Sequence, residues 1–270
     1  MYTAPTDDMQ FLIDDVLDVG SVLGALPAYA ELGLGGELTT ALLDEAAKFA
    51  ADIVSPLRRI GDTTPARCSD SAVTIPPGYA EAIQQLGAGG WVGISAPQEE
   101  GGQGLPELFG TAACEMWNSA DMAFALEPFL SAGAALAISA HANEALKSTY
   151  LEKIYSGQWS GTMNLTESGA GSDLSPMKTR AERQGDHYLI YGQKIYITWG
   201  DHDATENIVH LVLARLPDAP EGSRGISLFL VPKFLVNDDG SLGERNDAYP
   251  VSVEHKLGIH GSPTLSLIHI

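Results

Sequence analysis

The 270-residue chain is long enough to bury a large core in one or two domains. Hydrophobic residues make up 44% of the sequence and charged residues 19%, which is typical of a soluble globular protein. The 35 acidic and 15 basic side chains give a formal net charge of −20, which argues against a nucleic-acid partner and against binding to an anionic membrane.

The N-terminal residues are acidic, whereas a secretory signal peptide begins with basic ones. Cys68 and Cys114 lie far apart and lack the spacing of a zinc site or a disulfide framework. We therefore expect no metal site, a reducing cytoplasmic location, and partners that are small molecules or further copies of the chain.

The first 160 residues have the periodicity of helices. In residues 37–60 apolar side chains recur at steps of three and four, which predicts one amphipathic helix. Residues 77–91 begin with prolines and end in glycines, as helices often do. Residues 106–120 and 141–157 have similar patterns.

Residues 123–140 form the most apolar stretch, AFALEPFLSAGAALAISA. Glu127 and Pro128 interrupt it, so no apolar run reaches the length that a membrane span needs. We interpret this stretch as part of a buried helical hairpin and expect no membrane span.

Beyond residue 157 the pattern changes to alternation with a period of two, which predicts strands. Residues 180–198 read as two strands with a turn near Gly185–Asp186 and a second turn at Gly192. Residues 206–216 and 225–236 are apolar runs of strand length. The predicted class is α+β: an all-helical domain, 1–160, precedes an antiparallel β-sandwich or barrel-like domain, 161–264.

A polar loop, NLTESGAGSDLSP at residues 164–176, follows the strand-like run WSGTMNLT. An ordinary connection needs one or two turn residues, whereas this loop collects small side chains, hydroxyls and backbone N–H groups. Such a composition suits a loop that closes on a ligand. The simpler interpretation is a plain turn between strands.

A second stretch, GQKIYITWG at residues 192–200, places Tyr196 two residues before Thr198, so that both side chains face the same side of a strand. An aromatic ring beside a hydroxyl, next to a loop rich in amide donors, suits a flat heteroaromatic ring that carries phosphates. The alternative is an ordinary pair of one core and one surface side chain.

These two stretches, in this order and spacing, resemble the flavin-binding core of the acyl-CoA dehydrogenase family. APQEEGGQGLP at 96–106 and KLGIHGSPT at 256–264 resemble further segments of that family, so the resemblance extends over the whole chain. It implies an N-terminal helical domain, a middle β domain and a C-terminal four-helix domain, which is missing here. It also implies FAD as the cofactor, bound between the β domain and the C-terminal helices.

The resemblance assigns six cofactor-binding residues. Leu165 and Thr166 would face the pyrimidine edge of the flavin, and Gly171 and Ser172 would lie against the pyrophosphate. Tyr196 would lie against the isoalloxazine ring, where the family often has tryptophan, and Thr198 would reach its N5/O4 side. Ser168 departs from the family's usual proline and loosens the loop backbone.

The same resemblance implies that the complete protein introduces an α,β double bond into an acyl-CoA thioester and passes electrons to an electron-transfer flavoprotein or a similar acceptor. A homo-oligomer is expected. The catalytic base would be a glutamate of the missing domain, so no catalytic residue is assigned; Glu167 and Asp173 are expected to brace the loop. The alternatives are an acyl-CoA oxidase or nitroalkane-type oxidase of the same superfamily, or a non-catalytic flavin-binding damage-response relative.

The last six residues, LSLIHI at 265–270, are the translation of CTG TCT CTT ATA CAC ATC, which resembles the end of a transposase-based sequencing adapter. We expect that they are a non-native tail and that the natural sequence departs from this one after Thr264. The alternative is a genuine short apolar segment. Sequencing the parent DNA beyond codon 264 distinguishes the two.

Overall fold

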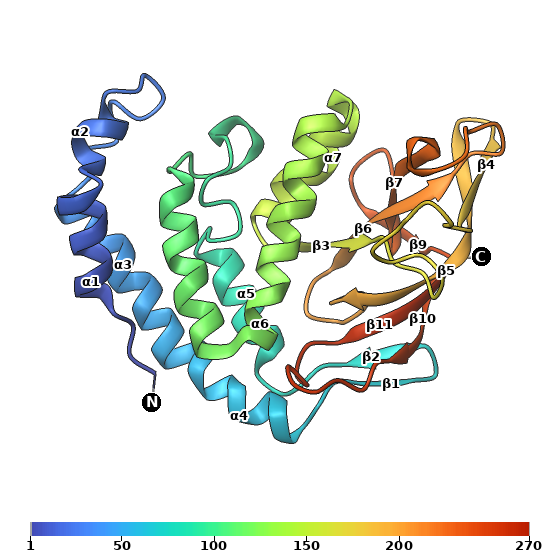
Figure 1. Ribbon diagram of the computed structural model, residues 1–270, viewed down its shortest axis with the longest axis horizontal. Helices are drawn as coiled ribbons and strands as arrows, with labels where there is room; N and C mark the ends of the chain where they lie inside the picture. The colour runs from blue at the N-terminus through green and yellow to red at the C-terminus, as the bar shows by residue number, and fades with distance from the viewer. Residues whose placement is uncertain (1, 270) are drawn as a thin grey trace.

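A computed structural model describes residues 2–269, and Met1 and Ile270 lie outside the described part. Most helices lie in the first part of the chain and most strands in the second, which agrees with the α+β class (Figure 1). The helical elements are α1 (Thr6–Gln10), η1 (Phe11–Val16), α2 (Val19–Gly24), α3 (Glu37–Phe49), η2 (Ala50–Val54), α4 (Ser55–Thr63), α5 (Tyr79–Ala88), η3 (Gln98–Glu100), α6 (Glu107–His141), α7 (Glu144–Tyr155) and η4 (Ser223–Gly225).

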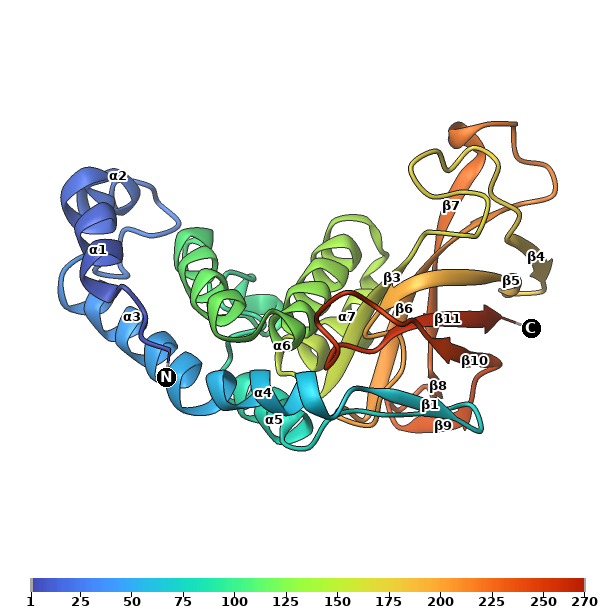
Figure 2. The same ribbon diagram turned by 60° about the horizontal axis from the view of Figure 1, so that its bottom comes forward.

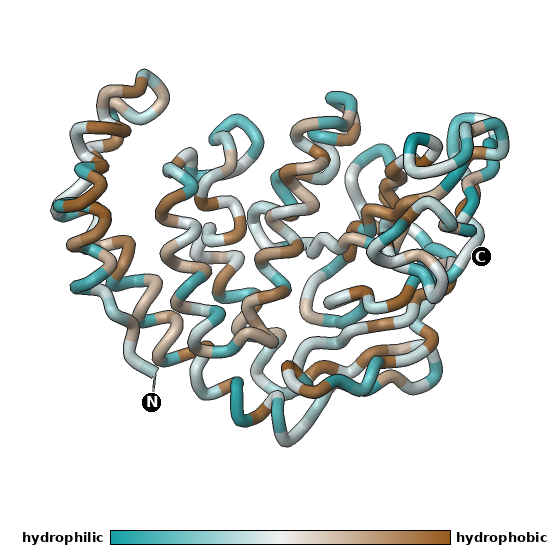
Figure 3. Tube along the Cα trace, in the orientation of Figure 1, coloured by the Kyte–Doolittle hydropathy of each residue, from teal (hydrophilic) through white to brown (hydrophobic). Residues whose placement is uncertain are grey.

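The amphipathic segment predicted over residues 37–60 forms α3, η2 and α4 in direct succession. Its apolar stripe is buried, with Leu43, Ala46, Ala50 and Val54 at most 2% exposed. Burial of this stripe against α6 stabilises the segment, because apolar surface leaves water. Figure 3 shows the hydrophobic positions recurring along this segment between polar ones.

Helix α6 consists of two arms that meet at Asp121, whose φ of −156° and ψ of 101° are not helical. By length and composition α6 is long and apolar enough to cross a membrane, but half of its most apolar window is buried inside the protein. Glu127 is buried there, where its carboxylate accepts hydrogen bonds from Ser131 and Ser160. The predicted buried helical hairpin is the better description of this segment.

The helical part also contains a β-hairpin that the sequence analysis missed. Strands β1 (Arg67–Ser69) and β2 (Ala72–Thr74) pair antiparallel around Asp70 and Ser71, both of which have positive φ. Two positive-φ residues fit a tight hairpin turn, but Asp-Ser is a weaker signal for it than Asn-Gly or Asp-Gly. The hairpin packs beside β10 (Ala248–Val253), as Figure 2 shows.

The β part is built on a seven-stranded sheet with the order β10-β11-β5-β4-β6-β3, to which β7 adds through β6. The strands beyond β2 are β3 (Trp159–Asn164), β4 (Arg180–Gln184), β5 (His187–Thr198), β6 (Asn207–Arg215), β7 (Ile226–Pro232), β8 (Phe234–Val236), β9 (Leu242–Arg245), β10 (Ala248–Val253) and β11 (Thr264–His269). The sheet is mixed, because β3 and β4 run parallel to β6, whereas the prediction was antiparallel pairing throughout.

The predicted turn at Gly185–Asp186 is confirmed, since it joins β4 to β5. The second predicted turn, at Gly192, is wrong, because β5 continues through that residue. Glycine is required there by a close approach: a Cβ atom would lie 2.3 Å from the Thr179 hydroxyl oxygen. The glycine therefore marks packing against the next segment and not a change of direction.

Strand β11 includes residues 264–269 and lies between β5 and β10. The side chains of Leu265 and Leu267 are at most 1% exposed and belong to the hydrophobic core. The segment predicted to be a non-native tail therefore occupies the place of a central strand in this structure. Apolar side chains at alternate positions suit such a place whatever their coding origin, so the origin of the tail stays a prediction.

Candidate functional site

The polar loop after β3 is held by one buried carboxylate. Glu167 accepts hydrogen bonds from the backbone N–H groups of Lys178 and Thr179, from the Thr179 hydroxyl and from the Lys194 ammonium. Burial would raise the pKa of this carboxyl, but these hydrogen bonds outweigh that effect and lower its pKa. Glu167 also exchanges two backbone hydrogen bonds with Ala170, which closes a tight turn. The expected bracing role of Glu167 is confirmed.

The backbone at the start of the loop presents donors. Lys194 donates to the Leu165 carbonyl at 2.9 Å, and the Ile195 N–H donates to the Thr166 carbonyl at 2.8 Å. Among the residues that the structure describes, the Thr166 N–H and hydroxyl have no partner. Because both carbonyls are engaged, this segment offers a ligand mainly donors, among them the N–H and the hydroxyl of Thr166.

Gly171 lies directly beside Thr166 and is exposed. A Cβ atom at Gly171 would meet one neighbour, the Thr166 methyl carbon, at an ordinary contact distance of 3.4 Å. Its φ is outside the left-handed region, so neither the backbone nor the packing requires glycine. Ser172 is also exposed, and the next residue, Asp173, accepts from the N–H and hydroxyl of Ser175. Asp173 thus braces the end of the loop, as expected.

Tyr196 is 61% exposed, although it is the largest side chain of its strand segment. It lies in a β-bulge, where Ser266 of β11 faces both Ile195 and Tyr196 of β5, and its φ is +60°. A bulky residue with positive φ is strained, and such strain and bulges are frequent at functional sites. Thr198 is half-buried on the same strand, two residues further on.

Four of the six predicted residues therefore lie near one another. Leu165, Thr166 and Gly171 belong to the loop, which contacts the strand segment that carries Tyr196. Ser172 and Thr198 adjoin this contact in the sequence. None of the six is buried.

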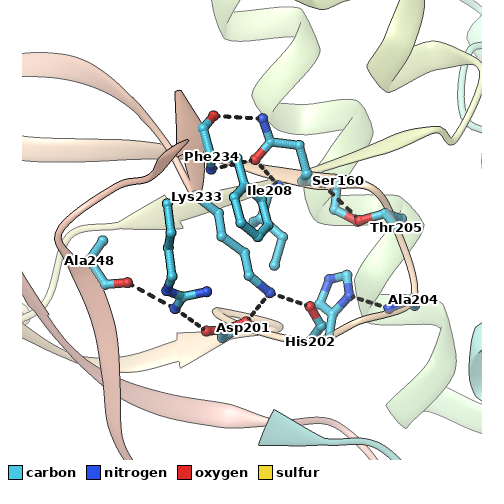
Figure 4. A network of polar contacts seen from close by, with 11 residues as sticks. Ser160, Asp201, His202, Ala204, Thr205, Ile208, Lys233, Phe234 and Ala248 are labelled. Carbon is cyan, nitrogen blue, oxygen red and sulfur yellow. Dashed lines mark hydrogen bonds and ion pairs between the residues drawn. The ribbon is translucent and has the colours of Figure 1, made fainter. Parts of the chain in front are cut away.

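A network of charged groups fixes the chain just after Thr198 (Figure 4). The buried carboxylate of Asp201 accepts from Lys233 at 2.5 Å and from Arg245 at 3.1 Å. Lys233 also donates to the carbonyl of His202, whose ring is 1% exposed. These contacts join the exit of β5 to Lys233, which lies between β7 and β8, and to Arg245 of β9. Because the partners are far apart in the chain, sequence patterns did not predict these contacts.

His202 is neutral in this network. Burial, and after it the nearby Lys233 charge, lower the pKa of His202 from 6.5 to about 3. Its Nδ1 accepts from the Ala204 N–H at 3.2 Å, so the proton resides on Nε2.

We expect this histidine to make the protein less stable in mild acid. Between pH 6.5 and about 3 the unfolded chain binds a proton that folded His202 does not, so the free energy of unfolding falls as pH falls. From pH 7 to pH 5 the loss is about 2 kcal/mol. Urea unfolding at both pH values should show a smaller loss for His202→Gln. Equal losses for the two proteins contradict this assignment.

A large cavity lies away from the loop, in the helical part. It has a volume of about 710 Å³, and both arms of α6 line it. Its walls are mainly apolar, with Trp91, Trp117, Phe129 and Leu136 among them, and Met163 of β3 reaches it from the sheet. The cavity has room for an alkyl chain. Because its walls come from segments separated in the sequence, the cavity was not predictable from sequence patterns.

Comparison with known proteins finds two matching domain families in the chain. Residues 37–158 match the N-terminal domain of acyl-CoA dehydrogenase, and residues 162–268 match its middle domain. The chain belongs to the acyl-CoA dehydrogenase family. The predicted family is thereby confirmed, and so is the fold class of a helical part followed by a curled sheet.

Two curated relatives of this family match nearly the whole chain. The 3-methylmercaptopropionyl-CoA dehydrogenase of Ruegeria pomeroyi is 49% identical over 97% of the chain and 44% of the relative. A butyryl-CoA dehydrogenase of Syntrophomonas wolfei is 37% identical over 96% of the chain and 43% of the relative. The chain thus spans less than half the length of these acyl-CoA dehydrogenases.

Solved structures of the acyl-CoA dehydrogenase fold agree. The glutaryl-coenzyme A dehydrogenase glutaryl-CoA complex has a TM-score of 0.69 and 26% identity, covering 87% of this chain and 54% of that chain. A chain in the structure of the electron transferring flavoprotein of Acidaminococcus fermentans has a TM-score of 0.69 and 27% identity, covering 87% and 55%. An acyl-CoA dehydrogenase of Bacillus anthracis complexed with FAD, at 24% identity and a TM-score of 0.68 over 85% and 35%, supports the fold.

Proposed function

We propose that this chain is the N-terminal and middle part of an FAD-dependent acyl-CoA dehydrogenase, which introduces an α,β double bond into an acyl-CoA thioester. The observation that carries the proposal is the contact between the loop at Thr166 and the bulged strand at Tyr196, in a chain that matches both family domains. This contact brings together the unpartnered donors of Thr166, the exposed ring of Tyr196 and Gly171, whose backbone is accessible.

The residues present fit FAD. The two free donors of Thr166 complement the acceptor atoms of a pyrimidine edge, and the exposed ring of Tyr196 offers a flat face. Gly171 has no side chain that would block the approach of a pyrophosphate to the backbone. The exposed Ser172 hydroxyl would donate a hydrogen bond to that pyrophosphate. When bound, FAD supplies the acceptor for the hydride that leaves the β-carbon of the substrate. We assign Thr198 to the edge of the ring that carries this acceptor atom.

We assign the acyl chain to the apolar cavity between the two arms of α6. Its wall of tryptophan, phenylalanine and leucine offers apolar surface against which an alkyl or thioether chain would be buried. The relatives' names include a methylmercaptopropionyl, a butyryl and a glutaryl substrate, so we propose the acyl-CoA class and not one member.

The proton at the α-carbon requires a carboxylate base, which we place in the part of the protein that lies outside this chain. Glu167 and Asp173 are already engaged as braces of the loop. We further propose an electron-transfer flavoprotein or a similar carrier as the acceptor, a homo-oligomeric assembly and a cytoplasmic location.

The test uses the full-length polypeptide that carries this chain. We expect the purified protein to bind FAD, to be yellow, and to bleach anaerobically on addition of butyryl-CoA or 3-methylmercaptopropionyl-CoA. A protein that stays colourless with added FAD contradicts the proposal. Peroxide release under air at the rate of turnover assigns the protein to the oxidases instead.

A further inference from the structure

We propose that the buried ammonium of Lys194 orients and polarises the Thr166 N–H through the Leu165 carbonyl, so that Lys194 is a positioning residue for the pyrimidine edge of the flavin. This inference rests on the proposed function. It concerns a residue that touches the loop from behind and, by its burial, does not reach the surface itself.

The position of Lys194 is unusual for a lysine. Its side chain is 0% exposed, and its ammonium group lies 2.9 Å from the Leu165 carbonyl oxygen and 3.0 Å from a carboxylate oxygen of Glu167. Burying an ion pair costs desolvation energy that an apolar pair of similar size does not, so its contribution to stability is small or unfavourable. Stability alone is therefore a poor reason for a lysine at this place.

The geometry of the peptide bond supplies a better reason. The Leu165 carbonyl and the Thr166 N–H belong to one planar trans peptide and point in opposite directions. Because the ammonium holds the carbonyl on the inner side, the Thr166 N–H is turned to the outer side. The Ile195 N–H holds the next carbonyl, that of Thr166, at 2.8 Å, so the segment is fixed from both sides.

The charge adds a second effect. A carbonyl that accepts a hydrogen bond from an ammonium group is polarised, and its peptide N–H becomes a stronger donor. The Thr166 N–H has no partner among the described residues, so this strengthened donor is available to a ligand acceptor. A ligand edge that gains electron density on reduction is then held more tightly in its reduced form, which raises its reduction potential.

Glu167 is the partner that keeps the Lys194 ammonium in place. Its carboxylate balances the charge of Lys194, and its bonds from Lys178 and Thr179 fix the place of the pair. A neutral residue at 167 leaves the ammonium on the Leu165 carbonyl, whereas a neutral residue at 194 removes it. The two single substitutions are therefore expected to move the flavin potential in different directions.

The experiment compares Lys194→Met with Lys256→Met in the full-length protein. Lys256 is a matched control, because its ammonium also donates to a backbone carbonyl, that of Ser262, at 2.9 Å, but in another loop. FAD affinity is measured by titration, the flavin midpoint potential by reductive titration, and the flavin absorption spectrum is recorded. We expect Lys194→Met to weaken FAD binding on the order of tenfold, to lower the potential and to shift the spectrum. Lys256→Met should leave all three unchanged.

Two further variants keep the result interpretable. Glu167→Gln should keep the potential at or above that of the wild type, and the double variant Glu167→Gln/Lys194→Met removes both buried charges, so it should fold even where Lys194→Met does not. The double variant should show the same lowered potential. A folded double variant with the potential and spectrum of the wild type overturns the inference, as does an equal shift in Lys256→Met. A wild-type protein that binds no FAD overturns the proposed function itself.

Discussion

Gly171→Val is expected to weaken FAD binding roughly 10²- to 10⁴-fold in the full-length protein without unfolding it. The backbone of Gly171 is proposed to lie against the pyrophosphate, and a branched side chain there removes the close approach. Two lost charge-assisted hydrogen bonds, at about 1.5–3 kcal/mol each, give this range. The measurement is FAD affinity by titration, with thermal unfolding of the apoprotein alongside it.

The structure makes this variant informative because nothing within the chain requires glycine at 171. An added Cβ meets one methyl carbon at 3.4 Å, and φ is not in the left-handed region. The fold should therefore be kept, and a loss of affinity reports on the ligand.

Gly169→Val is the matched control for this substitution. It makes the same change at the tip of the same loop, where a Cβ atom meets nothing within 4 Å. We expect it to bind FAD nearly as the wild type does, and Ser172→Ala to lose no more than about tenfold, since one hydroxyl is removed. Equal affinities for Gly171→Val and Gly169→Val contradict the assignment of the phosphates to this loop.

Most of the fold was predictable because burial follows periodicity. The stripe of residues 37–60 and the alternation beyond residue 157 each bury one face, and the structure forms helices and strands there. The direction of strand pairing was not predictable from periodicity, because β3 and β4 pair with β6 through contacts between residues distant in the sequence. The role of Gly192 was not predictable either, because glycine is required there by the close approach of Thr179 and not by a local turn.

The loop of the candidate site was predictable from its composition, and the role that we propose for it rests on the order of the motifs. The contacts that hold the loop in place were not predictable from the sequence. A lysine at position 194 in an alternating strand reads as a surface residue, and its complete burial on the Leu165 carbonyl depends on how the loop folds back. The strained backbone of Tyr196 likewise follows from the bulge opposite Ser266, for which the sequence carries no signal.

The carboxylates near the candidate site are poor candidates for a catalytic base. A base works best with a pKa near the operating pH and with its oxygens directed at the substrate. Hydrogen bonds from Thr179, Lys178 and Lys194 outweigh burial and keep the pKa of Glu167 below its ordinary value, and the carboxylate faces inward. Hydrogen bonds from the Ser175 hydroxyl and N–H lower the pKa of Asp173 in the same way.

Residues 1–270 by themselves are therefore expected to show no dehydrogenation with acyl-CoA substrates and excess FAD. With the base proposed to lie outside this chain, the α-proton is expected to lack a positioned acceptor, a deficit on the order of 10²- to 10⁴-fold in rate for general-base catalysis. The measurement is anaerobic single-turnover bleaching of FAD with butyryl-CoA, compared with the full-length protein, after circular dichroism has shown that the chain is folded. Glu167→Gln in the full-length protein is the companion variant: it should still bleach FAD, since this carboxylate is not the base. Bleaching by the chain alone at the full-length rate places the base within residues 1–270 and overturns the role given to Glu167 and Asp173.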